Sequence, residues 1–262
     1  MNFALITYTL VQREMVRFFR QKNRILGALG TPLVFWFLLG SGFSSAFRLP
    51  LPLSLEPTAR NLNYMQFFFP GTILLTLLFT AIFSTISIIE DRREGFLQGI
   101  LVAPVPRSSL VLGKLLGGAI LATIQGILFY ILTPFLGLYF GFGNFLYSLL
   151  VIFVISFGLT GLGFLIAWRL DSTQGFHAIM NLFLMPLWLL SGSVFPIEGV
   201  PSWLKFLMNW NPLTYANAGL HLGFSTLRYP NSILSSKVLC LAIILVFSVM
   251  MFWFSVKIAE KE

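Results

Sequence analysis

Charged residues are scarce in this sequence. They make up 10% of the 262 residues, and Asp and Glu together number nine. Hydrophobic residues account for 57%, and the mean hydropathy is +0.87. Soluble globular chains carry about 25% charged residues. The composition therefore excludes an ordinary soluble domain and predicts a membrane protein.

Residues that form disulfides or bind metals are also scarce. Cys240 is the single cysteine, and His177 and His221 are the two histidines. Neither histidine has a Cys or carboxylate partner at metal-ligand spacing, so we expect no metal site. No carboxylate lies in the middle of an apolar run. That absence argues against an ion-coupled carrier, because such carriers use ionisable groups inside the membrane.

Long apolar runs dominate the rest of the chain. A helix needs ~20 apolar residues to cross a bilayer, and six runs of about that length occur at 25–47, 64–89, 114–140, 145–168, 175–195 and 238–256. No repeat or change in composition marks a second domain. We predict an all-α membrane protein with one transmembrane domain over residues 1–262. Its six-span bundle occupies 25–256, and 257–262 form a polar tail.

The segment before the first run is predicted to be an amphipathic helix over residues 1–24. Apolar residues recur at three- and four-residue spacing at Leu5, Tyr8, Val11, Met15 and Phe18. The opposite face carries Arg13, Arg17, Arg20 and Arg24. This pattern is typical of a helix that lies flat on a membrane, with its apolar face toward acyl chains and its basic face toward anionic headgroups.

Residues 90–114, EDRREGFLQGILVAPVPRSSLVLGK, form a polar island between the second and third runs. It opens with the charged residues Glu90, Asp91, Arg92, Arg93 and Glu94. A predicted two-turn helix follows, with one apolar face made of Phe96, Leu97, Ile100 and Leu101. Pro104 and Pro106 end that helix, and Ser108 or Ser109 is predicted to cap the next one. We interpret the segment as a rigid elbow that docks a soluble partner, rather than as a plain loop.

The distribution of Lys and Arg predicts the orientation. Five of the seventeen fall on the side opposite the N-terminus, namely Arg48, Arg60, Lys205, Arg228 and Lys237, which leaves twelve on the N-terminal side. Membrane proteins concentrate Lys and Arg in cytoplasmic loops. Both termini, residues 90–114 and a second polar island at 169–174 are therefore predicted to be cytoplasmic. The net charge of +8 is explained in the same way, so we expect no nucleic-acid partner.

Two segments resemble type-2 ATP-binding cassette exporter permeases, a family that includes drug-resistance, nodulation lipo-oligosaccharide and capsular polysaccharide exporters. The first is the EDRREG, ILVAPVPR and GK pattern within residues 90–114. The second is SGSVFPIEGVPSWLKFLMNWNPLTYANAGL, residues 191–220. His221 stands where many members have Arg, which leaves the charge at that point open. With the N-terminal helix and six spans, the resemblance covers essentially the whole chain.

The resemblance implies partners and site residues. Such permeases form a homodimer, or pair with a similar permease, in the bacterial cytoplasmic membrane, and they bind cytoplasmic ATPase subunits. It implies that the charged residues 90–94 orient the elbow and that the apolar face at 96–101 packs toward the ATPase. It also implies a re-entrant pair of short helices between spans five and six, which closes the outer exit and involves Pro196, Pro201, Trp203, Asn211, Pro212 and Tyr215. An outer loop with interfacial Trp and Tyr would use the same residues.

The chain lacks the phosphate-binding pattern G-x4-G-K-[ST], because Gly113-Lys114 is followed by Leu115. We therefore expect no cofactor in this chain and no enzymatic activity of its own, with ATP-Mg on a separate ATPase subunit. The alternatives are a membrane-embedded lipid-modifying enzyme and an ion-coupled carrier. The apolar spans suit a hydrophobic drug, a lipid, or a lipid-linked or polysaccharide substrate, and the sequence leaves this choice open.

Overall fold

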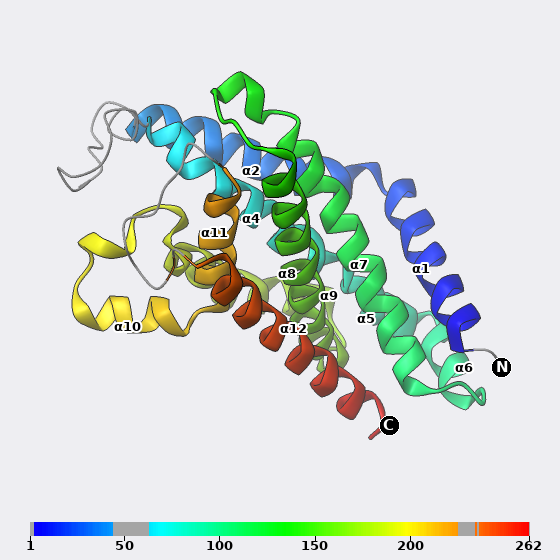
Figure 1. The fold of residues 1–262 in the computed structure, drawn as a ribbon. Helices are drawn as coiled ribbons and strands as arrows, with labels where there is room; N and C mark the ends of the chain where they lie inside the picture. The colour runs from blue at the N-terminus through cyan, green and yellow to red at the C-terminus, as the bar shows by residue number, and fades with distance from the viewer. Residues whose placement is uncertain (1–2, 44–62, 225–233, 235, 262) are drawn as a thin grey trace.

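The computed structural model of the protein describes residues 3–43, 63–224, 234 and 236–261. Within these residues every regular element is a helix (Figure 1). The α-helices are α1 Phe3–Arg20, α2 Lys22–Phe43, α4 Tyr64–Ser84, α5 Ile86–Arg93, α6 Phe96–Val102, α7 Arg107–Tyr130, α8 Phe142–Arg169, α9 Thr173–Trp188, α10 Ser202–Trp210, α11 Pro212–Gly223 and α12 Lys237–Ala259. Short helical turns are η1 Thr133–Leu136, η2 Leu189–Ser193 and η3 Ile197–Gly199.

Six helical segments are long and apolar enough to cross a membrane. They are Leu26–Phe43, Tyr64–Arg93, Arg107–Tyr130, Phe142–Arg169, Thr173–Ser193 and Lys237–Ala259. This confirms the predicted all-α class and the six spans. The predicted end of the first run, at 44–47, lies outside the described residues, as do Arg48, Arg60 and Arg228.

The helix α4 is the centre of the bundle. In the most apolar part of α4–α5, 94% of the residues are buried, against 17% in α2. The helices α2, α7, α8 and α11 all pack against α4. Its polar side chains are accommodated locally: Thr72 and Thr76 each donate a hydrogen bond to the carbonyl four residues earlier. Trp188 of α9 donates to the carbonyl of Gly71, which fixes α9 against the middle of the bundle.

The third span differs from its predicted bounds at both ends. The helix α7 begins at Arg107 rather than at 114, directly after Pro106, because the two prolines end the preceding segment but do not prevent helix after them. The prediction that Ser108 or Ser109 caps this helix is wrong, since the Ser109 hydroxyl instead donates to the Pro106 carbonyl. The helix ends at Tyr130 rather than at 140, because Pro134 has no amide to donate and Thr133 Oγ1 bonds the Tyr130 carbonyl instead.

The N-terminal helix also ends earlier than predicted. Gln21 separates α1 from α2, so Arg24 belongs to α2, and its side chain lies outside the described residues. The helix α1 packs along α7 and buries Ile6, Leu10 and Phe18. The predicted apolar face is therefore divided: Phe18 is buried in the protein, whereas Leu5 and Tyr8 are exposed. Contact with membrane lipid by α1 stays a prediction.

The fifth span is followed by two short helices, α10 and α11. The predicted run 175–195 comprises α9 and the turn η2, where Gly192 adopts a positive φ of 76° that favours glycine. The helix α11 is buried against α8 and α12, while α10 exposes Trp203 and Trp210. The two predicted helices are thus present, and whether they re-enter a membrane stays a prediction.

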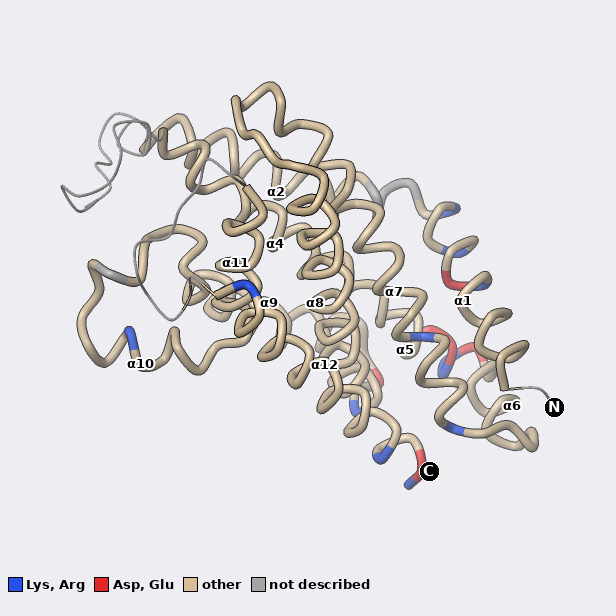
Figure 2. Tube along the Cα trace, viewed as in Figure 1, with Lys and Arg blue, Asp and Glu red and all other residues tan. Residues whose placement is uncertain are grey.

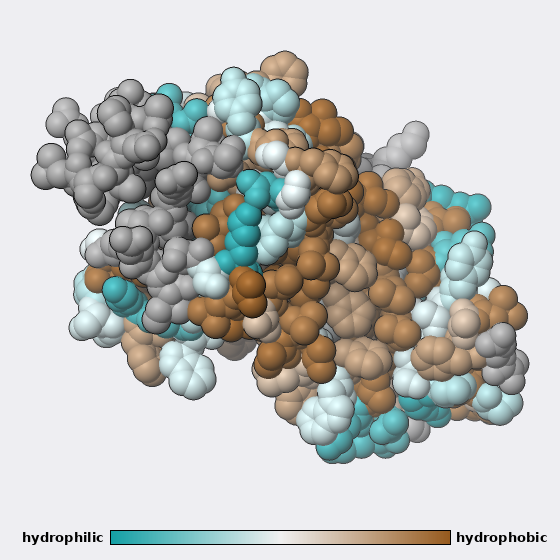
Figure 3. All heavy atoms as spheres, in the orientation of Figure 1, coloured by the Kyte–Doolittle hydropathy of each residue, from teal (hydrophilic) through white to brown (hydrophobic). Residues whose placement is uncertain are grey.

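Charged residues gather at one end of the bundle. Figure 2 shows blue and red along α1, around α5 and α6, and at the C-terminal end of α12, with long uncharged stretches between this end and the opposite one. The helix α10, which includes Lys205, and the start of α12, at Lys237, lie away from this end in Figure 1. Figure 3 shows hydrophobic side chains over the middle of the same face, bounded by hydrophilic ones on α1 and at the lower edge. The end that holds α1 and α5 is therefore where the structure concentrates its polar chemistry.

Candidate functional site

Six charged side chains from three helices meet beside the elbow. We call them the charge cluster, and its members are Arg13, Glu14 and Arg17 of α1, Glu90 and Asp91 of α5, and Lys114 of α7. Three are cations and three are carboxylates, so the cluster is neutral overall. Neutrality matters because burying a charge without a partner costs roughly several kcal/mol of folding free energy. The α1 members of the cluster lie 73 to 100 residues in the sequence from their partners on α5 and α7.

Asp91 is the centre of the cluster. Its side chain is 1% exposed and accepts hydrogen bonds from three cations. Arg13 donates from both terminal nitrogens, at 2.9 Å to Oδ2 and 2.5 Å to Oδ1. Arg17 donates to Oδ1 at 2.7 Å, and Lys114 Nζ donates to Oδ2 at 2.5 Å. The hydrogen bond to Asp91 also raises the pKa of Arg13 above its ordinary value, so the guanidinium stays charged.

Glu14 and Lys114 complete the buried part of the cluster. Their side chains are 5% and 4% exposed, and Lys114 Nζ lies 2.5 Å from Glu14 Oε1. The same ammonium donates to the Ser87 hydroxyl at 3.1 Å. Lys114 thus uses all three of its donors on protein groups. It ties α7 to α1 through Glu14 and to α5 through Asp91.

Glycines on α7 let α1 approach closely enough to make these contacts. A Cβ atom at Gly113 would lie 2.7 Å from Leu10 Cβ, and one at Gly117 would lie 2.9 Å from Glu14 Cβ. Two glycines four residues apart present a flat face on a helix, the small-residue pattern of close helix packing in membranes. Lys114 lies next to this face, so its ammonium reaches between the two helices.

A second set of contacts joins the two polar islands. Arg92 Nη1 donates to Asp171 Oδ1 at 3.0 Å, and its Nη2 donates to the carbonyl of Trp168 at 2.5 Å. Arg93 donates to the Asp171 carbonyl from Nε at 3.1 Å and from Nη2 at 2.8 Å. The predicted elbow charges are thus brought together with the end of α8, a contact that the sequence did not predict.

The helix α6 presents the predicted apolar residues in different environments. Leu97 is 3% exposed and packs in the main core, so it supports the elbow from inside. Phe96 is 38% exposed and carries the Arg13 guanidinium 3.7 Å from its ring centre. Ile100 and Leu101 are half-buried. Val102, which the sequence analysis did not include, is 88% exposed and is the most exposed apolar side chain of this helix.

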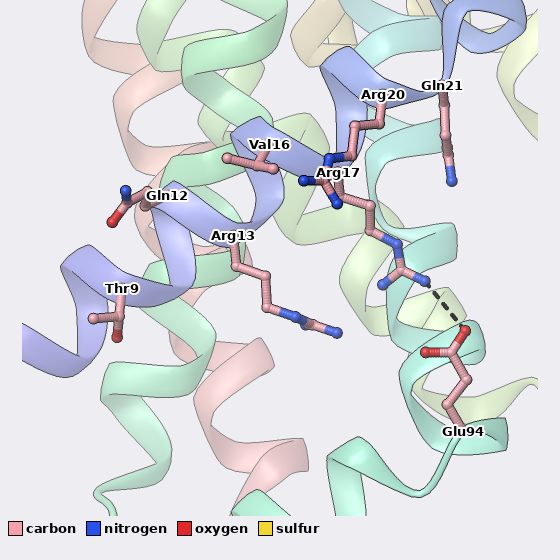
Figure 4. A pocket seen from close by; sticks show the side chains of 8 residues that line it. All are labelled: Thr9, Gln12, Arg13, Val16, Arg17, Arg20, Gln21 and Glu94. Carbon is pink, nitrogen blue, oxygen red and sulfur yellow. Dashed lines mark ion pairs between the residues drawn. The ribbon is translucent and has the colours of Figure 1, made fainter.

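The outer face of α1 borders a cavity of about 630 Å³. Figure 4 shows Arg13, Arg17 and Arg20 from α1 on its wall, with Glu94 opposite. Arg17 Nη2 lies 2.7 Å from Glu90 Oε2 and 3.8 Å from Glu94 Oε1. Arg13 and Arg17 therefore face carboxylates of the elbow, whereas the sequence reading directed both toward lipid headgroups. Arg20 is exposed and makes no ion pair with any residue that the structure describes.

Among the predicted outer residues, Asn211 and Tyr215 make side-chain hydrogen bonds to backbone groups in and around α10 and α11. Asn211 Oδ1 accepts from the Leu213 amide at 3.0 Å and so caps α11, while its Nδ2 donates to the Leu187 carbonyl at 2.6 Å. Pro212 occupies the first turn of α11, and Tyr215 donates to the Asn209 carbonyl at 3.0 Å. Trp203 is 65% exposed on α10. Pro196 precedes η3, and Pro201 precedes α10.

Glu14 and Lys114 were missed by the sequence reading, although a signal for each was present. Glu14 is the only acidic residue before Glu56, and it continues the four-residue spacing of Ile6, Leu10 and Phe18, so it lies in a buried stripe. Lys114 begins the predicted third span, and a lysine at that place is costly unless a carboxylate pairs with it. Together the two positions indicated a buried ion pair.

This architecture is that of a multi-pass helical membrane protein whose N-terminal helix is joined by buried ion pairs to an elbow between its second and third spans. A sequence model described as "ABC-2 type transporter" matches residues 6–225, and the chain belongs to that family. It is 30% identical over 211 residues to the protein named transport permease ycf38 of Cyanophora paradoxa, covering 79% of this chain and 70% of that protein.

The names of two further relatives mention a transported cargo or a biological process. The chain is 33% identical over 162 residues to the multidrug ABC transporter permease YbhR of Escherichia coli (strain K12), which covers 59% of this chain and 42% of that protein. It is 25% identical over 215 residues to nodulation protein J of Rhizobium leguminosarum bv. viciae, covering 76% of this chain and 79% of that protein. The predicted family is therefore confirmed.

Proposed function

We propose that this chain is the membrane permease subunit of an ATP-driven exporter, and that α6 and the charge cluster transmit the movement of a separate ATPase subunit to the spans. The observation that carries the proposal is the set of hydrogen bonds from Arg13, Arg17 and Lys114 to Asp91. Because α5 continues from the central helix α4 after Thr85, a force on the elbow reaches the core of the bundle directly.

The partner ATPase binds and hydrolyses ATP-Mg in this proposal, because the chain carries no phosphate-binding pattern of its own. Its contact surface is the exposed side of α6, with Val102 and the outer edge of Phe96. Leu97, Ile100 and Leu101 hold α6 in place from within. The Arg92 and Arg93 contacts to Asp171 fix the elbow against the end of α8, so that the elbow moves as one unit with α8.

The orientation of the chain in the membrane and its pairing with a second permease are part of the same proposal. Both termini and both polar islands face the cytoplasm, in the cytoplasmic membrane of a bacterium. Two copies, or this chain and a similar permease, form the transport unit. The low burial of three spans supports pairing with a second copy or a similar permease. Only 17%, 33% and 28% of the residues in the most apolar parts of α2, α9 and α12 are buried within one chain. The name of the multidrug relative favours a hydrophobic drug as cargo. A lipid and a lipid-linked or polysaccharide substrate are the alternatives that the apolar spans also suit.

Capture of the ATPase by variants of α6 tests this function. Wild-type permease purified from its native membranes is expected to bring down an ABC ATPase, identified by mass spectrometry. Val102→Asp is expected to reduce that recovery at least tenfold, because it places a charge in an apolar contact, without changing the thermal stability of the permease. Phe135→Asp is the matched control, since Phe135 is equally exposed (86%) but lies in η1 at the other end of the bundle.

Leu97→Asp separates the supporting role from the contact role. Leu97 is buried, so this variant is expected to destabilise the permease itself. Full recovery of the ATPase and full transport by Val102→Asp would refute α6 as the contact. Absence of any ABC ATPase from the wild-type preparation would refute the function.

A further inference from the structure

A second cavity lies far from the charge cluster in sequence, between the C-terminal parts of α8 and α12 and the N-terminal half of α9. Its volume is about 660 Å³. The inner wall is apolar and includes Leu165 of α8, Ile179 of α9 and Trp253 of α12. The rim holds three cations, Arg169, Lys257 and Lys261, and no carboxylate from the described residues 3–43, 63–224, 234 and 236–261 lines the cavity.

The rim cations differ from those of the charge cluster in their ion pairing. In the part of the chain that the structure describes, Arg169, Lys257 and Lys261 make no ion pair, and all three side chains are exposed. Lys257 Nζ instead lies 3.8 Å above the ring of Trp253. A lysine held over an aromatic face is positioned, yet it keeps its donors for another acceptor.

Figure 1 places the ends of α8 and α12 together at the lower edge of the bundle, and Figure 2 shows Lys and Arg colouring there. This edge is where the spans end, so an amphiphile of the adjacent leaflet reaches the cavity with its headgroup at the rim. Figure 3 shows hydrophobic surface over the spans above a hydrophilic lower edge. The cavity therefore has the two halves that a phospholipid needs, an apolar slot and a cationic end.

We propose that this cavity is a binding site for an anionic phospholipid, with the phosphate between Arg169, Lys257 and Lys261 and an acyl chain along Leu165, Ile179 and Trp253. Basic pockets between spanning helices select anionic headgroups, and each Lys or Arg near an anionic surface contributes about 1 kcal/mol. Anionic rather than zwitterionic lipid is favoured because the rim residues that the structure describes carry three positive charges and no negative one. The inference requires a membrane-spanning chain, and it is independent of the ATPase and of the exported cargo.

Lipid retention by the purified permease tests the site. Protein in detergent is incubated with equal amounts of phosphatidylglycerol and phosphatidylcholine of identical acyl chains, and bound lipid is counted by native mass spectrometry. Wild type is expected to retain phosphatidylglycerol preferentially. Arg169→Gln and Lys257→Gln are each expected to lower that preference about fivefold, the change that corresponds to about 1 kcal/mol per cation. The double variant is expected to lower it further.

The controls separate lipid from other ligands and from loss of fold. Lys205→Gln removes one exposed cation outside the cavity and is expected to leave the preference unchanged. Trp253→Ala is expected to weaken retention of both lipids, because it shortens the apolar wall. Circular dichroism and size-exclusion profiles confirm that each variant is folded.

Three outcomes would overturn the proposal. The first is equal retention of the two lipids by wild type, and the second is an equal loss of preference with Lys205→Gln. The third is displacement of phosphatidylglycerol by millimolar inorganic phosphate, which would assign the rim to a free phosphate instead of a lipid. Because no ATPase is present in the assay, each outcome leaves the proposed transport function to its own test.

Discussion

Lys114 Nζ lies 2.5 Å from Glu14 Oε1 across the contact of α7 with α1, and both side chains are at least 95% buried. The pair joins residues 100 positions apart. It belongs to a neutral cluster of three cations and three carboxylates, which is what allows charges to be placed between helices of a largely apolar bundle.

Removal of one member of this pair is expected to destabilise the protein. Breaking a buried ion pair costs about 3–5 kcal/mol when the other charge stays buried. When Glu14 is replaced, Lys114 keeps Asp91 as a partner, which reduces this cost. Glu14→Gln and Lys114→Met are each expected to lower the thermal midpoint in detergent, and the double variant is expected to be more stable than the sum of the two effects predicts. Strictly additive losses would show that the two side chains are not coupled.

Asp91→Asn is expected to release α1 from the elbow. The substitution leaves Arg13, Arg17 and Lys114 facing a neutral amide, so the cluster gains an unbalanced positive charge. Trypsin cleavage within α1, after Arg13 and Arg17, is expected to be at least several-fold faster than in wild type. Glu94→Gln serves as control, because the Glu94 side chain is 63% exposed. Equal cleavage rates for all three proteins would contradict the role of Asp91 as the centre of the cluster.

Asn211→Ala is expected to destabilise the junction of α10 with α11. It removes the cap on the Leu213 amide and the hydrogen bond to the Leu187 carbonyl. Loss of a helix cap alone costs about 0.5–2 kcal/mol. Thermal unfolding followed by circular dichroism measures the change. Asn209→Ala is the control, because its side chain is exposed; an equal effect of both variants would rule out the capping account.

Gly71→Ala is expected to separate α4 from η2. A Cβ atom there would lie 2.5 Å from Ser193 Cβ and 3.0 Å from Ser193 Cα, too close without backbone movement. Overpacking of this kind costs about 1–3 kcal/mol. Gly30→Ala in α2 is expected to be neutral or stabilising, since no atom lies within 4 Å of the added methyl group. A stability equal to wild type for Gly71→Ala would show that this contact is looser than described.

Much of the fold could be predicted because its signals are local. Apolar runs set the six spans, and Pro104 and Pro106 set the place where α6 ends and α7 begins. Boundaries failed where a neighbouring group decided them: Thr133 rather than a helical amide bonds the Tyr130 carbonyl, and Gln21 ends α1 before the arginine pattern ends. The sequence predicted one part of the candidate site, the elbow at residues 90–114. Glu14 and Lys114 each carry a local signal of burial, but their pairing was not identified, because the sequence does not state which distant charge each one meets.

The sequence by itself determined the class of this protein. Its 57% hydrophobic content and the lengths of its runs require a membrane solvent for most of its surface, and the motifs at 90–114 and 191–220 indicate its family. Only the tertiary structure decided which charges are paired and which are free to bind a ligand. Arg13 and Arg17 look equivalent to Arg169 and Lys257 in sequence, as cations beside apolar segments. The first two are neutralised by carboxylates brought from α5, whereas the last two line a cavity to which no described residue contributes a carboxylate, because charge pairing depends on distance in space.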